Sequence, residues 1–120
     1  MLTYDQALPK VRAWFSRPEA VYGYDGYNSC IYRGDENPAS EVRCGIGCLM
    51  PDELYRPEME GTAVGAFFDD DSLPFLDPEY VPSWERLQAA HDRFAEGGFP
   101  CSEFVEWLDE EIERRGGHVA

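Results

Sequence analysis

The chain has 120 residues, of which 43% are hydrophobic, and a formal net charge of −14. This length can bury one hydrophobic core, so we expect a single globular domain over residues 1–120 that folds without a metal or disulfides. The excess negative charge repels nucleic-acid backbones and anionic membranes, which argues against direct binding to either and favours a basic protein partner.

The sequence contains no evident export signal or membrane anchor. No apolar run approaches the roughly 18 residues of a membrane-spanning helix. The N-terminus also lacks the basic and then apolar stretches of a secretory signal. We therefore expect a cytoplasmic protein, in which the four cysteines are reduced thiols rather than a disulfide framework.

The first predicted helix covers residues 3–16. Thr3 and Gln6 have the spacing of a capping box. Pro9 leaves two alternatives open, because it either bends this helix or lies at its first position. The helix should end at Arg17-Pro18, since the residue before a proline avoids helical backbone angles. The apolar side chains at helical spacing are Tyr4, Leu8, Val11, Trp14 and Phe15.

The middle of the chain predicts a small β-hairpin and a glycine-rich segment. Residues 30–33 are β-prone and are followed by a turn sequence, so we pair them with 42–46 as two strands. Arg43–Tyr55, which reads RCGIGCLMPDELY, places two cysteines and two glycines among apolar residues. We call this segment the hub, and its glycines indicate close packing against a neighbouring segment. Within it, a proline followed by acidic residues predicts one helical turn at 51–55.

A short helix and a loop follow the hub. Residues 63–68 carry apolar side chains at helical spacing and end at an acidic run, so we expect a short helix there. Residues 72–82 hold three prolines and no regular period. They predict a surface loop that lays apolar side chains on the core.

Two longer helices complete the chain. Residues 83–96 show helical periodicity between Ser83, a good N-cap, and a pair of glycines. Ser102 is the expected N-cap of the last helix, over 103–115. Together these elements predict an α+β fold, a single small domain that is mostly helical and contains a short β-hairpin.

The last helix should present an acidic face, because its apolar side chains form one stripe and its carboxylates lie opposite. Carboxylates at helical spacing can present charge as a phosphate backbone does, and so compete for a basic nucleic-acid-binding surface. An ordinary solvated face is the alternative. The candidate partner-binding residues are Glu103, Glu106, Asp109, Glu110 and Glu113 in this helix and Asp69, Asp70 and Asp71 in an acidic loop.

Three cysteines and a histidine form a candidate metal or catalytic set. In the predicted hairpin Cys30, Cys44 and Cys48 come close together, and His91 faces inward on its helix. Three thiolates and an imidazole are a known zinc ligand set, although the usual two close cysteine pairs are missing. Buried unreactive thiols are one alternative and cysteine catalysis with His91 as base is another. Asp92 is turned about 100° from His91 around the helix, which places it poorly to orient the ring.

Three motifs resemble those of a widespread family of small, uncharacterised proteins from bacterial and phage genomes. They are CxYRG at 30–34, CxxGCLxPDE at 44–53 and LQxxHD at 87–92, and an EG pair at 60–61 belongs with them. We know of no established activity for this family, so the resemblance implies mobility between phage and host. The cysteines and His91-Asp92 are part of the shared pattern, whereas the acidic last helix is particular to this chain.

These features favour a non-enzymatic protein without a cofactor. We expect an acidic interaction protein, encoded by a phage or prophage, that binds and inhibits a basic, nucleic-acid-handling host defence protein by charge mimicry. The alternative is a small enzyme or zinc-binding module that uses Cys30, Cys44, Cys48 and His91. A third hypothesis is that the acidity serves only solubility.

Overall fold

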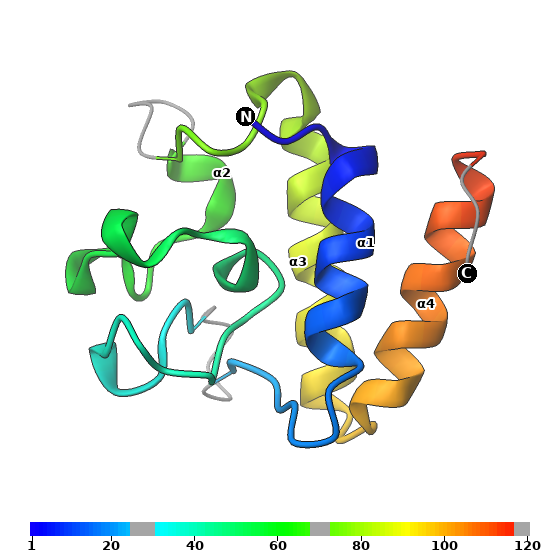
Figure 1. Cartoon of the computed structure of the whole chain (residues 1–120), viewed down its shortest axis with the longest axis horizontal. Helices are drawn as coiled ribbons and strands as arrows, with labels where there is room; N and C mark the ends of the chain where they lie inside the picture. The colour runs from blue at the N-terminus through cyan, green and yellow to red at the C-terminus, as the bar shows by residue number, and fades with distance from the viewer. Residues whose placement is uncertain (25–30, 68–72, 117–120) are drawn as a thin grey trace.

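The computed structural model of the protein describes residues 1–24, 31–67 and 73–116. Within these ranges the chain is helical, as Figure 1 shows. The α-helices are α1 (Tyr4–Phe15), α2 (Val64–Phe67), α3 (Val81–Glu96) and α4 (Cys101–Arg114). Short 3-10 turns connect them: η1 (Gly34–Glu36), η2 (Gly47–Leu49), η3 (Asp52–Leu54), η4 (Pro57–Met59) and η5 (Pro78–Tyr80). None of the described helices is long and apolar enough to cross a membrane.

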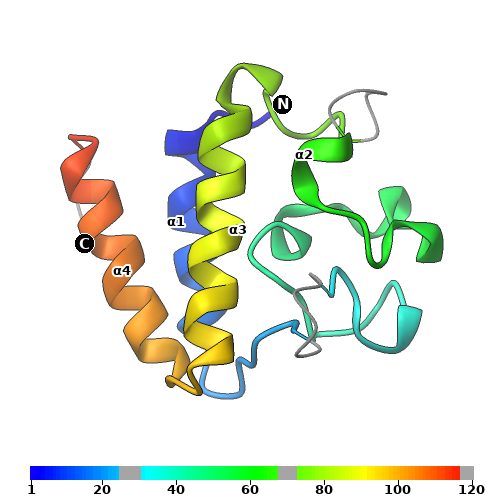
Figure 2. The same ribbon diagram turned by 180° about the vertical axis from the view of Figure 1, so that it is seen from behind.

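Helices α1 and α3 lie side by side in the centre of the molecule (Figures 1 and 2). α4 flanks them on one side, and the segment 31–67, which we call the loop half, flanks them on the other. The rings of Tyr4 and Trp84 meet edge to face between α1 and α3, with their centroids 5.5 Å apart. One hydrophobic cluster joins the two sides, and its fully enclosed members include Val11, Ile46, Trp84, Leu87, Phe104 and Leu108.

Helix α1 confirms the capping box predicted at its start. Thr3 Oγ1 accepts a hydrogen bond from the Gln6 backbone, and the Gln6 side chain accepts one from the Thr3 backbone. Pro9 lies inside the helix, which begins at Tyr4, so the alternative start near Pro9 is wrong. The helix ends at Phe15, close to the predicted end.

Helices α3 and α4 each begin two residues earlier than the predicted starts. Tyr80 is the N-cap of α3, and Pro82 lies in its first turn, where the missing proline N–H is one that a helix does not use. Pro100, in extended conformation, is the N-cap of α4. The predicted N-caps Ser83 and Ser102 are therefore wrong, because the prolines before them already set the helix starts.

The α+β prediction is wrong, since the described ranges contain no strand. Segments 31–34 and 42–44 do lie together, with Gly34 N donating to Val42 O and Cys44 N to Ile31 O, both at 2.9 Å. Between these bonds, however, the backbone N–H groups of Tyr32 and Arg33 donate to the Glu60 carboxylate at 3.0 Å each. A hairpin ladder cannot continue through donors that a side chain has taken. Residue 30 of the predicted hairpin lies outside the described ranges.

The hub is packed as closely as its glycines indicate. A Cβ on Gly47 would lie 2.6 Å from the carbonyl oxygen of Tyr32, a distance that no side chain can occupy. Gly45 faces α3, where its added Cβ would lie 3.4 Å from Cβ of His91. The turn predicted at 51–55 is confirmed as η3, and the short helix predicted at 63–68 is confirmed as α2. The predicted loop at 72–82 contains η5 and, at its end, the first residues of α3.

Candidate functional site

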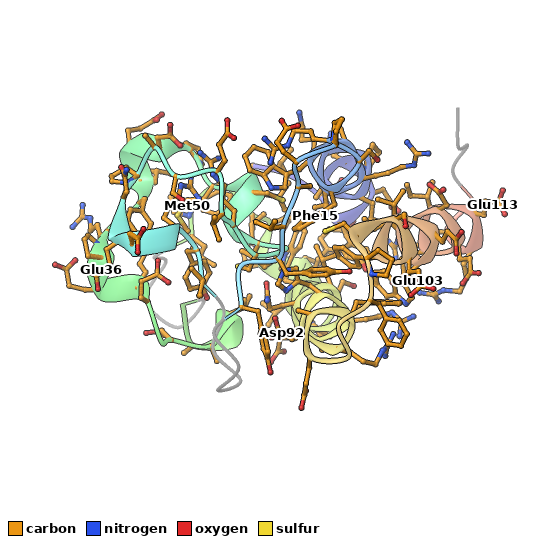
Figure 3. The ribbon with its side chains drawn as sticks, turned by 90° about the horizontal axis from the view of Figure 1, so that it is seen from below. Phe15, Glu36, Met50, Asp92, Glu103 and Glu113 are labelled. Atoms are coloured by element: carbon orange, nitrogen blue, oxygen red, sulfur yellow. The ribbon has the colours of Figure 1, made fainter. Side chains whose placement is uncertain are left out.

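The outer side of α4 carries a row of carboxylates. Phe104, Leu108 and Ile112 bury the inner side of this helix against the core. At about 100° per residue, four glutamates fall within about 80° of arc opposite that buried side. We call them the acidic row: Glu103, Glu106, Glu110 and Glu113. Glu103 is partly exposed and the other three are exposed. Figure 3 labels the two ends of the row, with Glu113 at the outer edge of the molecule.

Asp109, which the sequence placed on the acidic face, is not part of this row. Its carboxylate forms an ion pair with Arg12 of α1. The two side chains are about one-third exposed, at 30% and 33%. Asp109 therefore helps to fix α4 against α1, and its charge is compensated. The other predicted binding residues, Asp69, Asp70 and Asp71, lie outside the described ranges.

Glu111 is an acidic residue of α4 with a structural role that the sequence reasoning missed. It is 2% exposed and lies between α1, α3 and α4. Burial raises the pKa of its carboxyl group, but hydrogen bonds from Arg86, Arg114 and Tyr4 outweigh that effect and lower the pKa to about 2. The Arg86 Nε and Tyr4 hydroxyl distances are both 2.7 Å. The available signal was its position on the apolar stripe, with an arginine three residues later.

Most of the positive charge of the protein is paired away from the acidic row. Among the described residues, seven of the ten basic side chains form ion pairs, and they do so with five carboxylates. No ion pair within the described ranges involves a member of the acidic row. The pairs are Arg12 with Asp109, Arg17 with Glu41, Arg33 and Arg43 with Asp52, Arg86 and Arg114 with Glu111, and Arg115 with Asp5. The row is therefore a line of uncompensated charge.

The candidate zinc set is only partly within the described ranges, because Cys30 lies outside them. Cys44 is buried and disulfide-bonded, so the expectation of four reduced thiols is wrong. Cys48 is a free thiol whose sulfur donates to the Gly45 carbonyl at 3.2 Å. Burial raises the pKa of Cys48 to about 12, which disfavours the thiolate that metal binding or nucleophilic attack requires. The described residues contain no group of three side chains that could hold a metal ion, and zinc binding stays a prediction.

His91 is fully buried and does contact Asp92, contrary to the sequence prediction. Its Nδ1 lies 2.8 Å from Oδ1 of Asp92, and Gln88 Nε2 donates to the same carboxylate oxygen at 2.8 Å. The 100° turn between the two residues therefore does not separate their side chains. His91 Nε2 is buried without a hydrogen-bond partner in the described structure. Rings of Phe15, Tyr22 and Phe104 pack around the imidazole.

Two charged residues, Arg33 and Glu60, hold the loop half together. Arg33, which is 1% exposed, donates to the backbone carbonyls of Gly47 at 2.5 Å and Met50 at 2.7 Å and to Asp52 at 3.0 Å. The Glu60 carboxylate accepts hydrogen bonds from the backbone N–H of Arg33 at 3.0 Å and from the hydroxyl of Tyr55 at 2.7 Å. The structural role of Arg33 and Glu60 was not predicted from the sequence. Each of them belongs to a motif on which the predicted family resemblance rests. The hub is therefore held by polar contacts that need no ligand.

A pocket lies between the C-terminus of α1 and the N-terminus of α4. Its volume is about 560 Å³. Sequence reasoning missed it because its two walls are far apart in the chain. The lining residues are Phe15, Ser16, Arg17, Pro18 and Ala20 on one side and Pro100, Cys101, Ser102 and Val105 on the other. The pocket is next to the start of the acidic row.

Comparisons with known proteins add no relative. No family model matches the chain, and neither the curated proteins nor the solved structures give a match. The resemblance to small bacterial and phage proteins therefore stays a prediction.

Proposed function

We propose that the protein is a non-enzymatic interaction protein that binds and inhibits a basic, nucleic-acid-handling protein by charge mimicry. The observation that carries this proposal is the acidic row on α4, which has no ion-pair partner among the described residues. Uncompensated carboxylates raise the local concentration of a cationic partner and speed its association. The net charge of −14 acts in the same direction.

The geometry of the acidic row suits a partner that binds a line of phosphates. Its members are three, four and three residues apart along one helix. At 1.5 Å of rise per residue the row extends over about 15 Å, with a negative charge every 4.5–6 Å or so. A basic surface that follows a nucleic-acid strand meets charges at comparable intervals. We therefore propose that the row occupies such a surface and displaces the nucleic acid.

Two features of the interior support the non-enzymatic reading over the alternative. The imidazole of His91 is enclosed by aromatic rings, and its exposed fraction is 0%. The Cys48 thiol has a raised pKa and donates to a backbone carbonyl. Both observations count against His91 and Cys48 as a catalytic pair. The resemblance to phage proteins makes a host defence protein the partner that we propose.

The test compares two variants of equal charge. The row variant changes all four members of the acidic row to Lys. The control variant changes Glu53, Glu58, Glu85 and Glu96 to Lys, four exposed glutamates that have no ion-pair partner among the described residues. Each substitution adds two charges, so four of them take both variants from −14 to −6. Far-ultraviolet circular dichroism and thermal unfolding are used to check that both variants are folded.

Wild type and control variant should capture the same protein from a host lysate, whereas the row variant should not. Capture should weaken as salt rises, and added double-stranded DNA should release the captured protein, because both compete for the same charges. Equal capture by the row variant, or a captured protein that DNA does not release, would show that charge mimicry by α4 is wrong.

A further inference from the structure

The pocket and the acidic row are neighbouring features of the same end of α4. Ser102 and Val105 line the pocket, and the next residue after each, Glu103 or Glu106, belongs to the row. Successive residues of a helix are turned by about 100°, so the two features occupy adjacent sides of the helix. A partner that lies along the row therefore reaches the pocket at the N-terminal end of α4.

The walls of the pocket are partly apolar. Pro18 and Val105 contribute apolar surface, beside the enclosed side chain of Phe15. The pocket's cation, Arg17, is already engaged: its Nε donates to the Trp14 carbonyl at 3.0 Å, and its guanidinium lies 3.6 Å from the centre of the Trp14 ring. A negatively charged ligand would therefore have to compete for it. The volume of about 560 Å³ lies within the range of about 300–1,000 Å³ that accommodates small organic groups.

Two exposed apolar residues are chain neighbours of pocket residues. Val21, 48% exposed, follows the pocket residue Ala20, and Phe99, 46% exposed, precedes the pocket residue Pro100. Beside Met1, these are the exposed large hydrophobic residues of the described ranges. Protein interfaces combine apolar side chains at their centre with a polar rim. The acidic row supplies that rim on one side.

We infer that the pocket receives one large apolar side chain of the basic partner while lysines or arginines of that partner pair with the acidic row. The inference rests on the proposed function and specifies the partner: a basic segment with an aromatic or aliphatic anchor beside its charges. Apolar anchors in a pocket give an interface most of its affinity, whereas surrounding charges give orientation and association rate. The acidic row alone would not distinguish one basic protein from another.

Two synthetic peptides test the inference. Both are helical, on an alanine background, with four lysines at the three-four-three spacing of the acidic row. One carries a phenylalanine one turn beyond the lysines at each end, and the other carries alanine at those positions. Because the spacing reads the same in both directions, either peptide can bind in either orientation. Dissociation constants are measured at low salt for the wild-type protein, Ser102→Trp and Ala89→Trp.

Ser102 is exposed on the pocket rim, so Ser102→Trp fills the pocket without changing the charge. Ala89 is an exposed residue of α3 and provides the matched control. The phenylalanine peptide should bind the wild type at least about tenfold more tightly than the alanine peptide, as expected for burial of one aromatic side chain. Ser102→Trp should abolish this preference, and Ala89→Trp should retain it.

The possible failures are distinguishable. Equal binding of the two peptides to the wild type overturns the anchor inference even if Ser102→Trp does not fold. If the alanine peptide then binds the wild type but not the row variant, the proposed function stands. A preference for phenylalanine that persists in a folded Ser102→Trp protein places the anchor elsewhere and also overturns the inference. Absence of binding by both peptides contradicts the inference and the proposed function together.

Discussion

The hydroxyl group of Tyr4 donates a 2.7 Å hydrogen bond to Oε2 of Glu111 and joins the first turn of α1 to the last turns of α4. Nε of Arg86, from α3, donates to the same oxygen at 2.7 Å. One carboxylate thus connects three helices. This contact helps to fix α4, and with it the acidic row, against α1 and α3.

Replacing Glu111 with Gln should lower the free energy of unfolding by about 2 kcal/mol, because Arg86 and Arg114 lose a buried charged partner. Urea denaturation followed by circular dichroism measures the change. Glu110→Gln removes the same charge from the neighbouring exposed residue and should change stability by less than about 0.5 kcal/mol. Similar effects of the two substitutions would contradict a stabilising role for the Glu111 contacts.

Acid should weaken the wild-type protein through the same carboxylate. The pKa of Glu111 is lowered to about 2 from an ordinary value of 4.5, since the hydrogen bonds from its donors outweigh burial. A group with a lowered pKa in the folded state contributes stability that is complete above its unfolded pKa and is lost as pH falls towards the folded one. The stability difference between wild type and Glu111→Gln should therefore shrink between about pH 4.5 and pH 2. A constant difference over that range would be inconsistent with this assignment.

Arg33→Met should destabilise the loop half by about 3 kcal/mol, because buried carbonyls of Gly47 and Met50 lose their hydrogen-bond donor. Hydrogen exchange should speed up in residues 31–60 and stay unchanged in α4. Arg56→Met removes an exposed arginine of the same segment and serves as the control. If both substitutions leave exchange unchanged, Arg33 does not hold the hub, and its buried charge would need another explanation.

The three long helices could be predicted from the sequence, but the hairpin prediction was wrong. Apolar periodicity identified α1, α3 and α4, because each buries one side against a single core. The hairpin prediction was wrong because of a contact that local sequence patterns do not reveal. Glu60, 28 residues after Tyr32, takes the backbone donors that a strand would have used. β-propensity describes local sequence, so it takes no account of a residue this far along the chain.

The candidate site, too, could be predicted from the sequence only in part. The four members of the acidic row could be located by counting residues along one helix, and Glu111 was correctly left off that face. The ion pair of Asp109 could not be predicted, since its partner Arg12 lies 97 residues earlier in the chain. The pocket depends on a contact between the ends of α1 and α4, which periodicity does not predict. Helix faces are local properties, whereas ion pairs and pockets depend on tertiary packing.

Arg12→Gln provides a test of the acidic row that increases binding instead of removing it. The substitution frees the carboxylate of Asp109, which lies beside the row on α4, and changes the net charge from −14 to −15. Lys10→Gln makes the same change in net charge on α1 without releasing a carboxylate, because Lys10 is exposed and has no ion-pair partner among the described residues. Both variants should stay within about 1 kcal/mol of the wild type in stability, as expected for partly exposed pairs.

Affinity for the lysine peptides described above should rise about twofold to fivefold in Arg12→Gln and less in Lys10→Gln, since only the first adds a free charge next to the row. The gain should disappear in high salt, where exposed charges are screened beyond a few ångströms. Equal gains in the two variants would mean that binding responds to net charge alone. The acidity would then act through the whole molecule, and the arrangement of carboxylates on α4 would have no part in recognition.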